Sequence, residues 1–193
     1  TLENLPDKVA IQLNDTHPTL AIPEMMRILL DECGFGWDKS FDICQKVFSY
    51  TNHTVMAEAL EKRNVDIFKM TLPRIYQIVV EMDRRAREKL EAAFPGDQGK
   101  INYMTLIGDN QVRMANICAY TANSINGVSK LHSEIIKESV FHDYYLFKPQ
   151  AFKNVTNGIA YRRWLLASNP ELCKLLDETI GTGYKHDAAD LSK

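Results

Sequence analysis

The chain has 193 residues, of which 45% are hydrophobic and 25% charged, and this composition is typical of one globular domain or of parts of two. Its net charge is −2, with both signs interspersed, so nothing in the composition indicates a nucleic-acid partner or an anionic membrane surface. No apolar run is long enough to span a bilayer, and residues 1–6 do not form a signal peptide. We therefore expect neither nucleic acid nor a membrane among its partners.

The four cysteines are widely spaced and form no Cys-x-x-Cys pair. Each lies among apolar neighbours, which favours buried free thiols in a reducing, cytoplasmic setting over disulfides or a metal site. The residues are Cys33, Cys44, Cys118 and Cys173. The chain has no initiator Met and opens almost directly into a predicted strand, so we expect it to be a piece of a longer protein.

The first predicted element is a strand that ends abruptly in polar residues. Five mostly apolar residues, 9–13, are followed by five polar or turn-forming ones, 14–18. Such an order is typical of a buried parallel strand that brings polar groups to the carboxyl edge of a sheet. Helical periodicity then predicts helices over residues 19–33, with Pro23 in the first turn, and over residues 37–47.

A second strand over residues 47–51 repeats this layout and also ends in polar residues. The unit is therefore β-α-α-β, which favours a helix-rich α/β fold around a parallel sheet. Open parallel sheets bind ligands outside the carboxyl ends of their strands. We expect one rim to be shared by the polar residues that follow both strands, Asn14, Asp15, His17, Asn52, His53 and Thr54.

The middle of the chain is predicted to be helical. Residues 56–61 form a short helix or turn, Asn64 caps a helix through Met70, and Thr71 caps a long helix that ends near Phe94. The segment 95–99 ends that helix, and residues 112–122 form the next. Residues 125–128 are a short third strand, in which Gly127 permits close approach of another backbone.

The last third of the chain is expected to be less regular. Ser129 begins a helix that ends at Val140, residues 141–152 are aromatic-rich and irregular, and residues 155–159 form a polar turn. A helix is predicted over 162–167, and Asn169 caps a last helix, with Gly181 just beyond its end. The polar tail from residue 183 is expected to be frayed.

Two histidines at strand ends, His17 and His53, permit more than one interpretation. With Asp15 they could form a metal site or an acid–base pair, but such metal sites use closely spaced ligands and a third ligand that the pattern lacks. We therefore predict no metal. The alternative that both histidines only cap loops and hydrogen-bond the backbone stays open. His132 lies on a predicted helix and is interpreted as a packing residue.

Phosphate-binding glycine loops are absent, since neither GxGxxG nor GxxxxGK[ST] occurs. A GxSxG elbow and a Cys–His arrangement for nucleophilic catalysis are also absent. The expected rim consists of Asn, Asp, Thr and His, whose donors and acceptors suit a ligand rich in hydroxyl groups. A carbohydrate fits this rim, although the spacing of the residues does not identify which one.

Four blocks of the sequence, in order, resemble one known family. They are residues 10–18 (AIQLNDTHP), 50–54 (YTNHT), 126–134 (NGVSKLHSE) and 154–165 (NVTNGIAYRRWL). They are similar to the middle of the α-glucan phosphorylases, which are the glycogen, starch and maltodextrin phosphorylases. The resemblance covers nearly the whole chain and weakens around 98–110 and in the tail. The pair Ala160-Tyr161 before the two arginines is similar to the bacterial members.

The resemblance implies phosphorolysis of α-1,4-glucan ends to glucose 1-phosphate, with pyridoxal phosphate as the cofactor and a homodimeric, cytoplasmic enzyme. It also implies two Rossmann-like domains, with doubly wound parallel sheets, that face each other across the catalytic cleft of a glycosyltransferase fold. Residues 1–157 would be the end of the N-terminal, glucan-binding domain, and residues 158–193 the start of the C-terminal, cofactor-binding domain.

The family's site residues carry over where the motifs match. By resemblance, His53 is catalytic, with its backbone carbonyl facing the reacting sugar and its ring holding a glucose hydroxyl. The other matches are substrate-binding: Asn157 for glucose hydroxyls, Asp15, His17, Thr54 and Ala59 along a small cavity, and Glu58 and Glu61 in the segment that follows.

No residue of the chain matches the family's cofactor lysine or its phosphate-binding basic residues, which belong to a later segment. We therefore expect the chain alone to be inactive. An alternative of a different class is a non-catalytic carbohydrate-binding or scaffold module. A cofactor-lysine segment downstream in the reading frame would distinguish the two.

Overall fold

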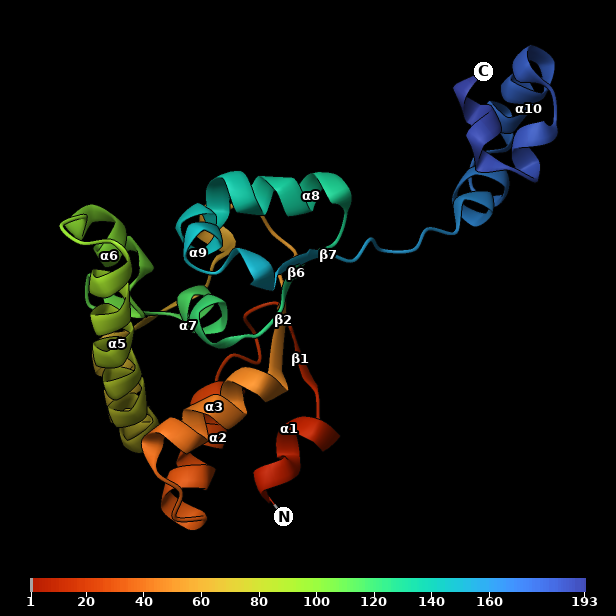
Figure 1. Ribbon diagram of the computed structural model, residues 1–193. Helices are drawn as coiled ribbons and strands as arrows, with labels where there is room; N and C mark the ends of the chain where they lie inside the picture. Colours follow the sequence, from red (N-terminus) through yellow and green to blue (C-terminus); the bar gives the residue numbers. More distant parts are fainter. Residues whose placement is uncertain (1) are drawn as a thin grey trace. The chain divides into compact units, whose positions relative to one another are not determined.

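Four short parallel strands form the centre of the larger part of the protein, in the order β1-β2-β6-β7 (Figure 1). The computed structural model describes residues 2–193, with only the backbone of Ala57 described. The chain forms two units, one ending at Thr156 and the other spanning Asn157–Lys193. The strands are β1 (Ile11–Asn14), β2 (Phe48–Thr51), β6 (Ile125–Gly127) and β7 (Phe152–Asn154).

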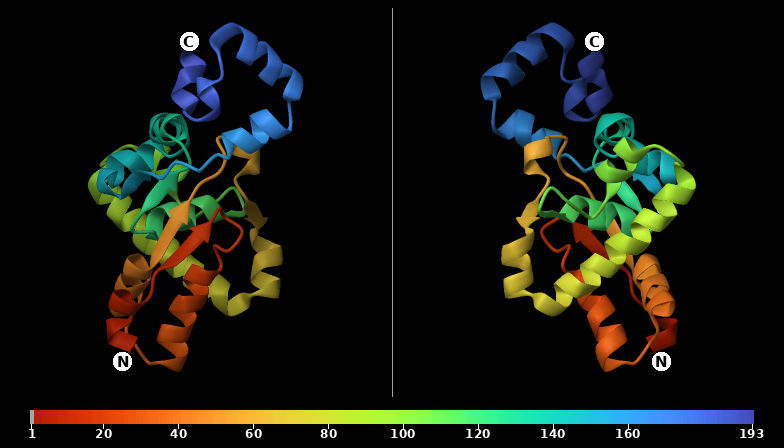
Figure 2. Two further views of the ribbon diagram at one scale, coloured as in Figure 1. Left: turned by 90° about the vertical axis from the view of Figure 1, so that its right-hand side faces the viewer. Right: turned by 90° about the vertical axis from the view of Figure 1, so that its left-hand side faces the viewer.

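The helices of the first unit lie on one side of this sheet (Figures 1 and 2). The strand order runs in one direction, and right-handed crossovers then place each connecting helix on the same face. Burial along β2 alternates accordingly, with Phe48 and Tyr50 buried and Ser49 and Thr51 only partly covered. Six of these helices are α1 (Leu5–Lys8), α2 (Ala21–Arg27), α3 (Trp37–Val47), α7 (Met114–Thr121), α8 (Lys130–Ile135) and α9 (His142–Phe147).

A row of polar side chains crosses the other face of the sheet. Gln12 Nε2 donates a hydrogen bond to Thr51 Oγ1 at 2.8 Å, and Thr51 Oγ1 donates to Asn126 Oδ1 at 2.8 Å. These residues belong to β1, β2 and β6, so one chain of hydrogen bonds spans three neighbouring strands. The strand we predicted as buried, β1, is instead an edge strand of this sheet, and only Leu13 in it is buried.

Strand β6 lies close to the backbone of helix α8 at Gly127, as we predicted from the sequence. A Cβ atom on Gly127 would lie 2.8 Å from the backbone nitrogen of Ser133 in α8. Asn126 of β6 pairs with Lys153 of β7, which completes the parallel sheet. The prediction of close backbone approach at Gly127 is therefore confirmed.

The long helix α5 (Pro73–Ala93) packs one apolar face into the core and leaves its charged face in solvent. Asn64 caps α4 (Val65–Thr71) as predicted, since its Oδ1 accepts from Asp66 N at 2.9 Å and Ile67 N at 3.1 Å. The expected cap at Thr71 is wrong, because Thr71 is the last residue of α4. Leu72 precedes α5 without a side-chain cap, and Pro73 fits the first helical position because it has no N–H to satisfy.

A second, antiparallel sheet was not predicted. It has the order β3-β5-β4, from β3 (Lys62–Asn64), β4 (Ile107–Gly108) and β5 (Gln111–Arg113). The predicted helix start at Val112 is therefore wrong, and α7 begins at Met114. Asp109 and Asn110 both have positive φ, 53° and 56°, which is the geometry of a two-residue hairpin turn. Helix α6 (Gln98–Met104) precedes this hairpin and is capped by Asp97.

The aromatic segment 141–152 is more regular than expected. It contains α9, a 3₁₀ turn (Pro149–Ala151) and the beginning of β7, the fourth strand of the parallel sheet. Tyr144 in α9 is fully buried, and its hydroxyl donates to the carbonyl oxygen of Met104 at 2.6 Å. Aromatic packing thus orders this segment, whereas the sequence showed mainly an interrupting Pro149.

The second unit is built on α10 (Pro170–Ile180), which Asn169 caps as predicted through a 3.2 Å bond from Leu172 N. The tail that we expected to be frayed is ordered as two 3₁₀ turns, Gly183–Lys185 and Ala188–Ser192. Tyr184 is buried, and its hydroxyl donates to the carbonyl oxygen of Cys173 at 3.3 Å. Burial of this one ring explains why the polar tail is not frayed.

All four cysteines are free thiols, three of them buried and Cys33 half-buried. Among residues 2–193, no helix combines the length and apolarity needed to cross a membrane.

Candidate functional site

Asn14 and His53 meet at the carboxyl edge of the parallel sheet. Asn14 is the last residue of β1 and pairs with Thr51, the last residue of β2, so His53 follows two positions after the neighbouring strand ends. His53 Nε2–H donates a hydrogen bond to Asn14 Oδ1, and both side chains are exposed. The ring is thereby oriented with Nδ1 left as an acceptor. The predicted shared rim is thus formed for these two residues.

Asn52 is the buried anchor of this edge. Its side chain is fully buried; Nδ2 donates to the Tyr50 hydroxyl at 3.0 Å, and Oδ1 accepts from Thr54 N at 3.1 Å. The same oxygen accepts from His132 Nε2 at 3.0 Å, while Nδ1 of that ring accepts from Val128 N at 3.1 Å. His132 therefore ties the end of β2 to the end of β6, which is the packing role expected for it.

Asp15 bends the chain immediately after β1. Its φ is 64°, in the left-handed region, and its backbone N–H donates to the carbonyl oxygen of Thr51 at 2.8 Å. Its Oδ1 accepts from Thr16 N at 2.7 Å, as a carboxylate does when it stabilises a tight turn. This conformation extends the pairing of β1 and β2 by one bond and turns the following residues away from the strand direction.

A second polar group forms around Glu61. The buried Thr16 donates from Oγ1 to Glu61 Oε2 at 2.7 Å, and Arg63 forms an ion pair with Glu61 Oε1 at 2.5 Å. Glu61 and His17 line a pocket of about 430 Å³ against Phe68 of α4. Thr16 was missed by the sequence reasoning, which considered only its polar neighbours Asp15 and His17.

The remaining predicted site residues take simpler positions. Thr54 Oγ1 accepts from Met56 N at 3.1 Å, and Glu58 and Ala59 lie exposed on a 3₁₀ turn, Ala57–Ala59. Asn157 is the first residue of the second unit and is exposed in a segment without regular structure. The first unit therefore brings Asn14 to His53, and Thr16 to Glu61, as two hydrogen-bonded groups.

These groups offer amides, hydroxyls, an imidazole and a carboxylate along one edge. Such groups can each donate to or accept from the hydroxyls of a polar ligand. Within the part of the chain that the structure describes, no three His, Cys, Asp or Glu side chains gather as ligands of a metal ion would. The edge is thus suited to binding and orienting a hydroxyl-rich molecule.

A half-buried lysine, Lys148, lies elsewhere, where α7 leads into β6. Lys148 Nζ donates to the carbonyl oxygens of Tyr120 at 3.0 Å and Ala122 at 2.8 Å, at the C-terminal end of α7. These acceptors favour the ammonium form, whereas burial opposes it and lowers the pKa of Lys148 to about 7. Lys148 thus serves as a cap for α7.

Comparison with known proteins gives a match over the whole chain. The family described as carbohydrate phosphorylase matches residues 1–193. The chain is 47% identical to the brain form of glycogen phosphorylase from Rattus norvegicus over 194 residues, which is 99% of this chain and 23% of that protein. It is also 47% identical to the muscle form from Mus musculus and to the liver form from Bos taurus, each over 191 residues, covering 97% of this chain and 23% and 22% of those proteins. The chain therefore spans about a quarter of the length of these relatives.

Proposed function

Because the chain belongs to the carbohydrate phosphorylase family, we propose that the protein containing it phosphorolyses α-1,4-glucan ends to glucose 1-phosphate. The resemblance read from the four sequence blocks is confirmed by the family match and by the 47% identity to glycogen phosphorylases. These residues would supply part of the wall that binds the terminal glucose. The observation that carries the proposal is a family match that extends over residues 1–193.

His53 is proposed to hold a hydroxyl of that glucose. Asn14 Oδ1 accepts from its Nε2, so Nδ1 is the ring atom that can accept from the sugar. The backbone carbonyl of His53 would face the anomeric carbon, where a carbonyl dipole stabilises developing positive charge. Asn157 would bind further glucose hydroxyls through its amide.

The other proposed contacts line the space beside the sugar: Asp15, His17, Thr54, Ala59, Glu58 and Glu61. Two features support this assignment. The bond from Thr16 holds the Glu61 carboxylate, and Glu61 and His17 line the same pocket. A carboxylate held in this way, with the exposed imidazole of His17 beside it, can accept from and donate to sugar hydroxyls.

Pyridoxal phosphate is the proposed cofactor of the full-length enzyme, where it would supply an acidic phosphate group. The residues of this chain do not fit it. A pyridoxal site requires a lysine amine, and within residues 2–193 no lysine hydrogen-bonds to Asn14, Asn52 or His53. The half-buried Lys148 is occupied by two carbonyl acceptors at the end of α7. We propose that the cofactor lysine lies outside this chain.

The chain is proposed to end one domain and begin another. Residues 1–157 would belong to a glucan-binding domain with a doubly wound sheet, and residues 158–193 to the cofactor domain. The chain divides after Thr156, one residue before this proposed boundary, which supports its placement. The full-length protein would act as a homodimer on glucan and phosphate.

The test is a phosphorolysis assay on the full-length protein and on the isolated 193-residue chain. With maltodextrin and phosphate, the full-length protein should release glucose 1-phosphate and show pyridoxal absorbance, and the isolated chain should do neither. A full-length protein that binds maltodextrin without releasing glucose 1-phosphate would support a carbohydrate-binding module instead. Release by the isolated chain would show that the catalytic groups lie within these 193 residues.

A further inference from the structure

The carbonyl of His53 and the N–H of Thr54 belong to one peptide group. A trans peptide is planar, so its C=O and its N–H point in opposite directions, and the described residues contain no cis peptide bond. This N–H donates to Asn52 Oδ1 at 3.1 Å, in the local turn that asparagine side chains form with the residue two positions on. Whatever holds Asn52 Oδ1 in place therefore also fixes the direction of the His53 carbonyl.

The oxygen of the His53 carbonyl is free. Within the described residues no hydrogen bond ends on it, and His53 itself is exposed. The preceding residue is tied into the sheet, because Asn52 N donates to the carbonyl oxygen of Asn126 in β6 at 3.0 Å. The chain thus passes from a fixed strand end to a free carbonyl within one residue, and the Asn52 side chain bridges that step.

The amide of Asn52 is held in one orientation. Its Nδ2 donates to the Tyr50 hydroxyl at 3.0 Å, while Oδ1 faces two donors, Thr54 N and His132 Nε2, the latter at 3.0 Å. Turning this fully buried amide over would place its NH₂ group against both donors and leave them without an acceptor. Two donors on one oxygen therefore lock the side chain that holds the Thr54 peptide.

The tautomer of His132 is fixed from the other side of its ring. A backbone N–H can only donate, so the 3.1 Å bond from Val128 N makes Nδ1 the acceptor and puts the proton on Nε2. The ring stands in the first turn of α8, where Ser129 Oγ accepts from His132 N at 3.1 Å and caps the helix. A continuous path of hydrogen bonds thus runs from the loop after β6 to the peptide after β2.

We propose that Asn52 and His132 are positioning residues of phosphorolysis that hold the His53 carbonyl toward the anomeric carbon, a role that rests on the proposed function of that carbonyl. Asn52 is fully buried and both ring nitrogens of His132 are occupied, so they act through the Thr54 peptide and not on the sugar. A fixed dipole stabilises developing positive charge without having to reorient during the reaction. The effect should therefore fall on the transition state more than on the bound substrate.

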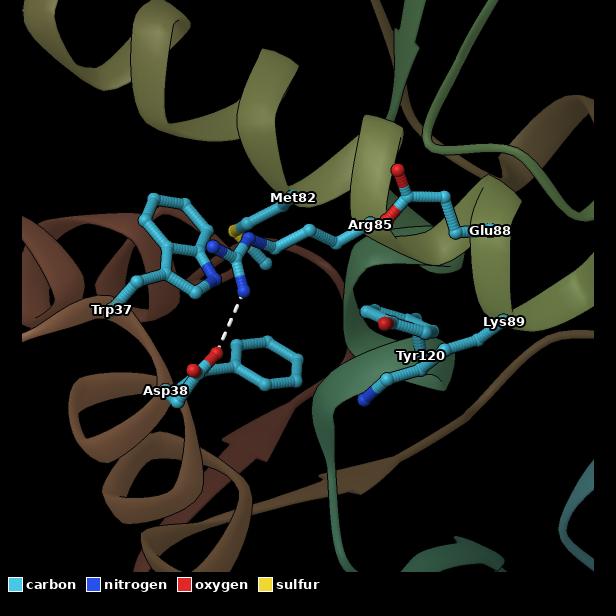
Figure 3. A pocket seen from close by; sticks show the side chains of 8 residues that line it. Trp37, Asp38, Met82, Arg85, Glu88, Lys89 and Tyr120 are labelled. Atoms are coloured by element: carbon cyan, nitrogen blue, oxygen red, sulfur yellow. Dashed lines mark hydrogen bonds and ion pairs between the residues drawn. The ribbon is translucent and has the colours of Figure 1, made fainter.

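The contacts of Arg85, in the same unit, are structural and provide a control (Figure 3). Arg85 pairs with Asp38 of α3 and with Glu81 of its own helix α5, each at 2.6 Å, and its guanidinium lies 5.1 Å from the centre of the Trp37 ring. These contacts join two helices and include no residue of the strand-end site. Arg85→Met removes them and should leave kcat and KM unchanged.

The test measures kcat, KM and Tm of the full-length protein with maltodextrin and phosphate. His132→Met removes the donor to Asn52, and kcat should fall about ten- to hundredfold while KM stays within about twofold. His132→Gln has the same length but places an N–H near the position of Nε2, so it should recover most of that loss. Both variants lose the bond from Val128 N, and their Tm values should fall alike. His132→Phe, which keeps a ring without a donor, should behave as His132→Met.

The proposal would be overturned by an equal loss of kcat in His132→Met and His132→Gln, or by losses of kcat that follow Tm across all the variants, Arg85→Met included. A change in KM alone would overturn it as well. If the unsubstituted protein released no glucose 1-phosphate, the proposed function would fail and this role with it. If it does release glucose 1-phosphate, each of the other outcomes refutes the positioning role alone.

Discussion

Asn14 and His53 lie 39 positions apart in the sequence, yet a hydrogen bond from His53 Nε2 to Asn14 Oδ1 joins their side chains. Parallel pairing of β1 with β2 brings the two residues together, because it aligns the ends of both strands. An asparagine in this place fixes the direction of the imidazole without adding a charge beside it. The position of His53 therefore depends on a residue of the neighbouring strand as well as on its own loop.

The first prediction concerns His53→Ala in the full-length enzyme. The substitution removes the ring but keeps the backbone carbonyl, so one hydrogen bond to a neutral hydroxyl is lost and activity should fall about two- to tenfold. Turnover and KM, measured against pH, check this expectation. The pH profile should keep its shape. Loss of the acid limb would instead make His53 a general acid or base.

Asn14→Ala should act through His53. Freeing the imidazole should lower kcat/KM about two- to tenfold, because the ring would no longer be held for the sugar. In a double-mutant cycle the effects of Asn14→Ala and His53→Ala should not add, since both remove the same oriented ring. Additive effects within about 0.3 kcal/mol would mean that Asn14 acts independently of His53.

The stability of the chain should depend on pH through Lys148. Burial lowers the pKa of Lys148 to about 7, so between pH 7 and the ordinary lysine pKa of 10.5 the unfolded state binds more protons than the folded state. Stability should therefore rise with pH in this window, by at most about 1.4 kcal/mol per pH unit. Urea unfolding of the chain and of Lys148→Met at pH 7 and 8.5 measures it. A difference between the two proteins that does not change with pH would contradict the expectation.

Two buried cysteines, Cys44 and Cys118, oppose the rise in stability at the upper end of this pH range. Burial raises the pKa values of Cys44 and Cys118 to about 12, so above pH 9 the folded state keeps thiol protons that the unfolded state loses. This effect lowers stability as pH rises, opposite in sign to that of Lys148. Both proteins contain the two cysteines, so the comparison with Lys148→Met cancels their contribution.

Asp83→Ala should destabilise the first unit strongly. Asp83 Oδ1 accepts from Leu106 N at 2.7 Å and Ile107 N at 3.1 Å, and so ties α5 to β4. Its removal leaves backbone donors buried without a partner, at a cost of about 2–4 kcal/mol in the free energy of unfolding. Asp83→Asn is the control: its amide oxygen can keep both of these bonds but the ion pair of Oδ2 with Arg87 Nε is lost, so urea unfolding should give it an intermediate stability.

Local sequence signals predicted the parts of the fold that depend on neighbouring residues. Asn64, Ser129 and Asn169 cap helices as expected, because a capping side chain bonds to backbone two or three positions away. The abrupt change from apolar to polar residues at Asn14 correctly placed a strand end. These features are encoded within a few residues, so a single sequence reveals them.

The features that we did not predict depend on contacts between residues far apart in the sequence. The antiparallel sheet is made of strands of two or three residues, too short to show an alternating pattern. The bond between Thr16 and Glu61 joins residues 45 positions apart and depends on where the segment after β2 returns. Tyr184 is likewise buried by contacts with α10 that the polar composition of the tail does not indicate.

The hydrogen-bonded row of Gln12, Thr51 and Asn126 has a consequence for how the strands find their alignment. Sliding β1 by one residue along β2 would turn Gln12 toward the apolar core and separate it from the Thr51 hydroxyl. Apolar side chains alone distinguish such shifted pairings weakly when strands are only three or four residues long. These hydrogen bonds form only when the strands are correctly aligned, so they stabilise that alignment over shifted ones. We therefore expect the three residues to be kept or replaced together in related sequences.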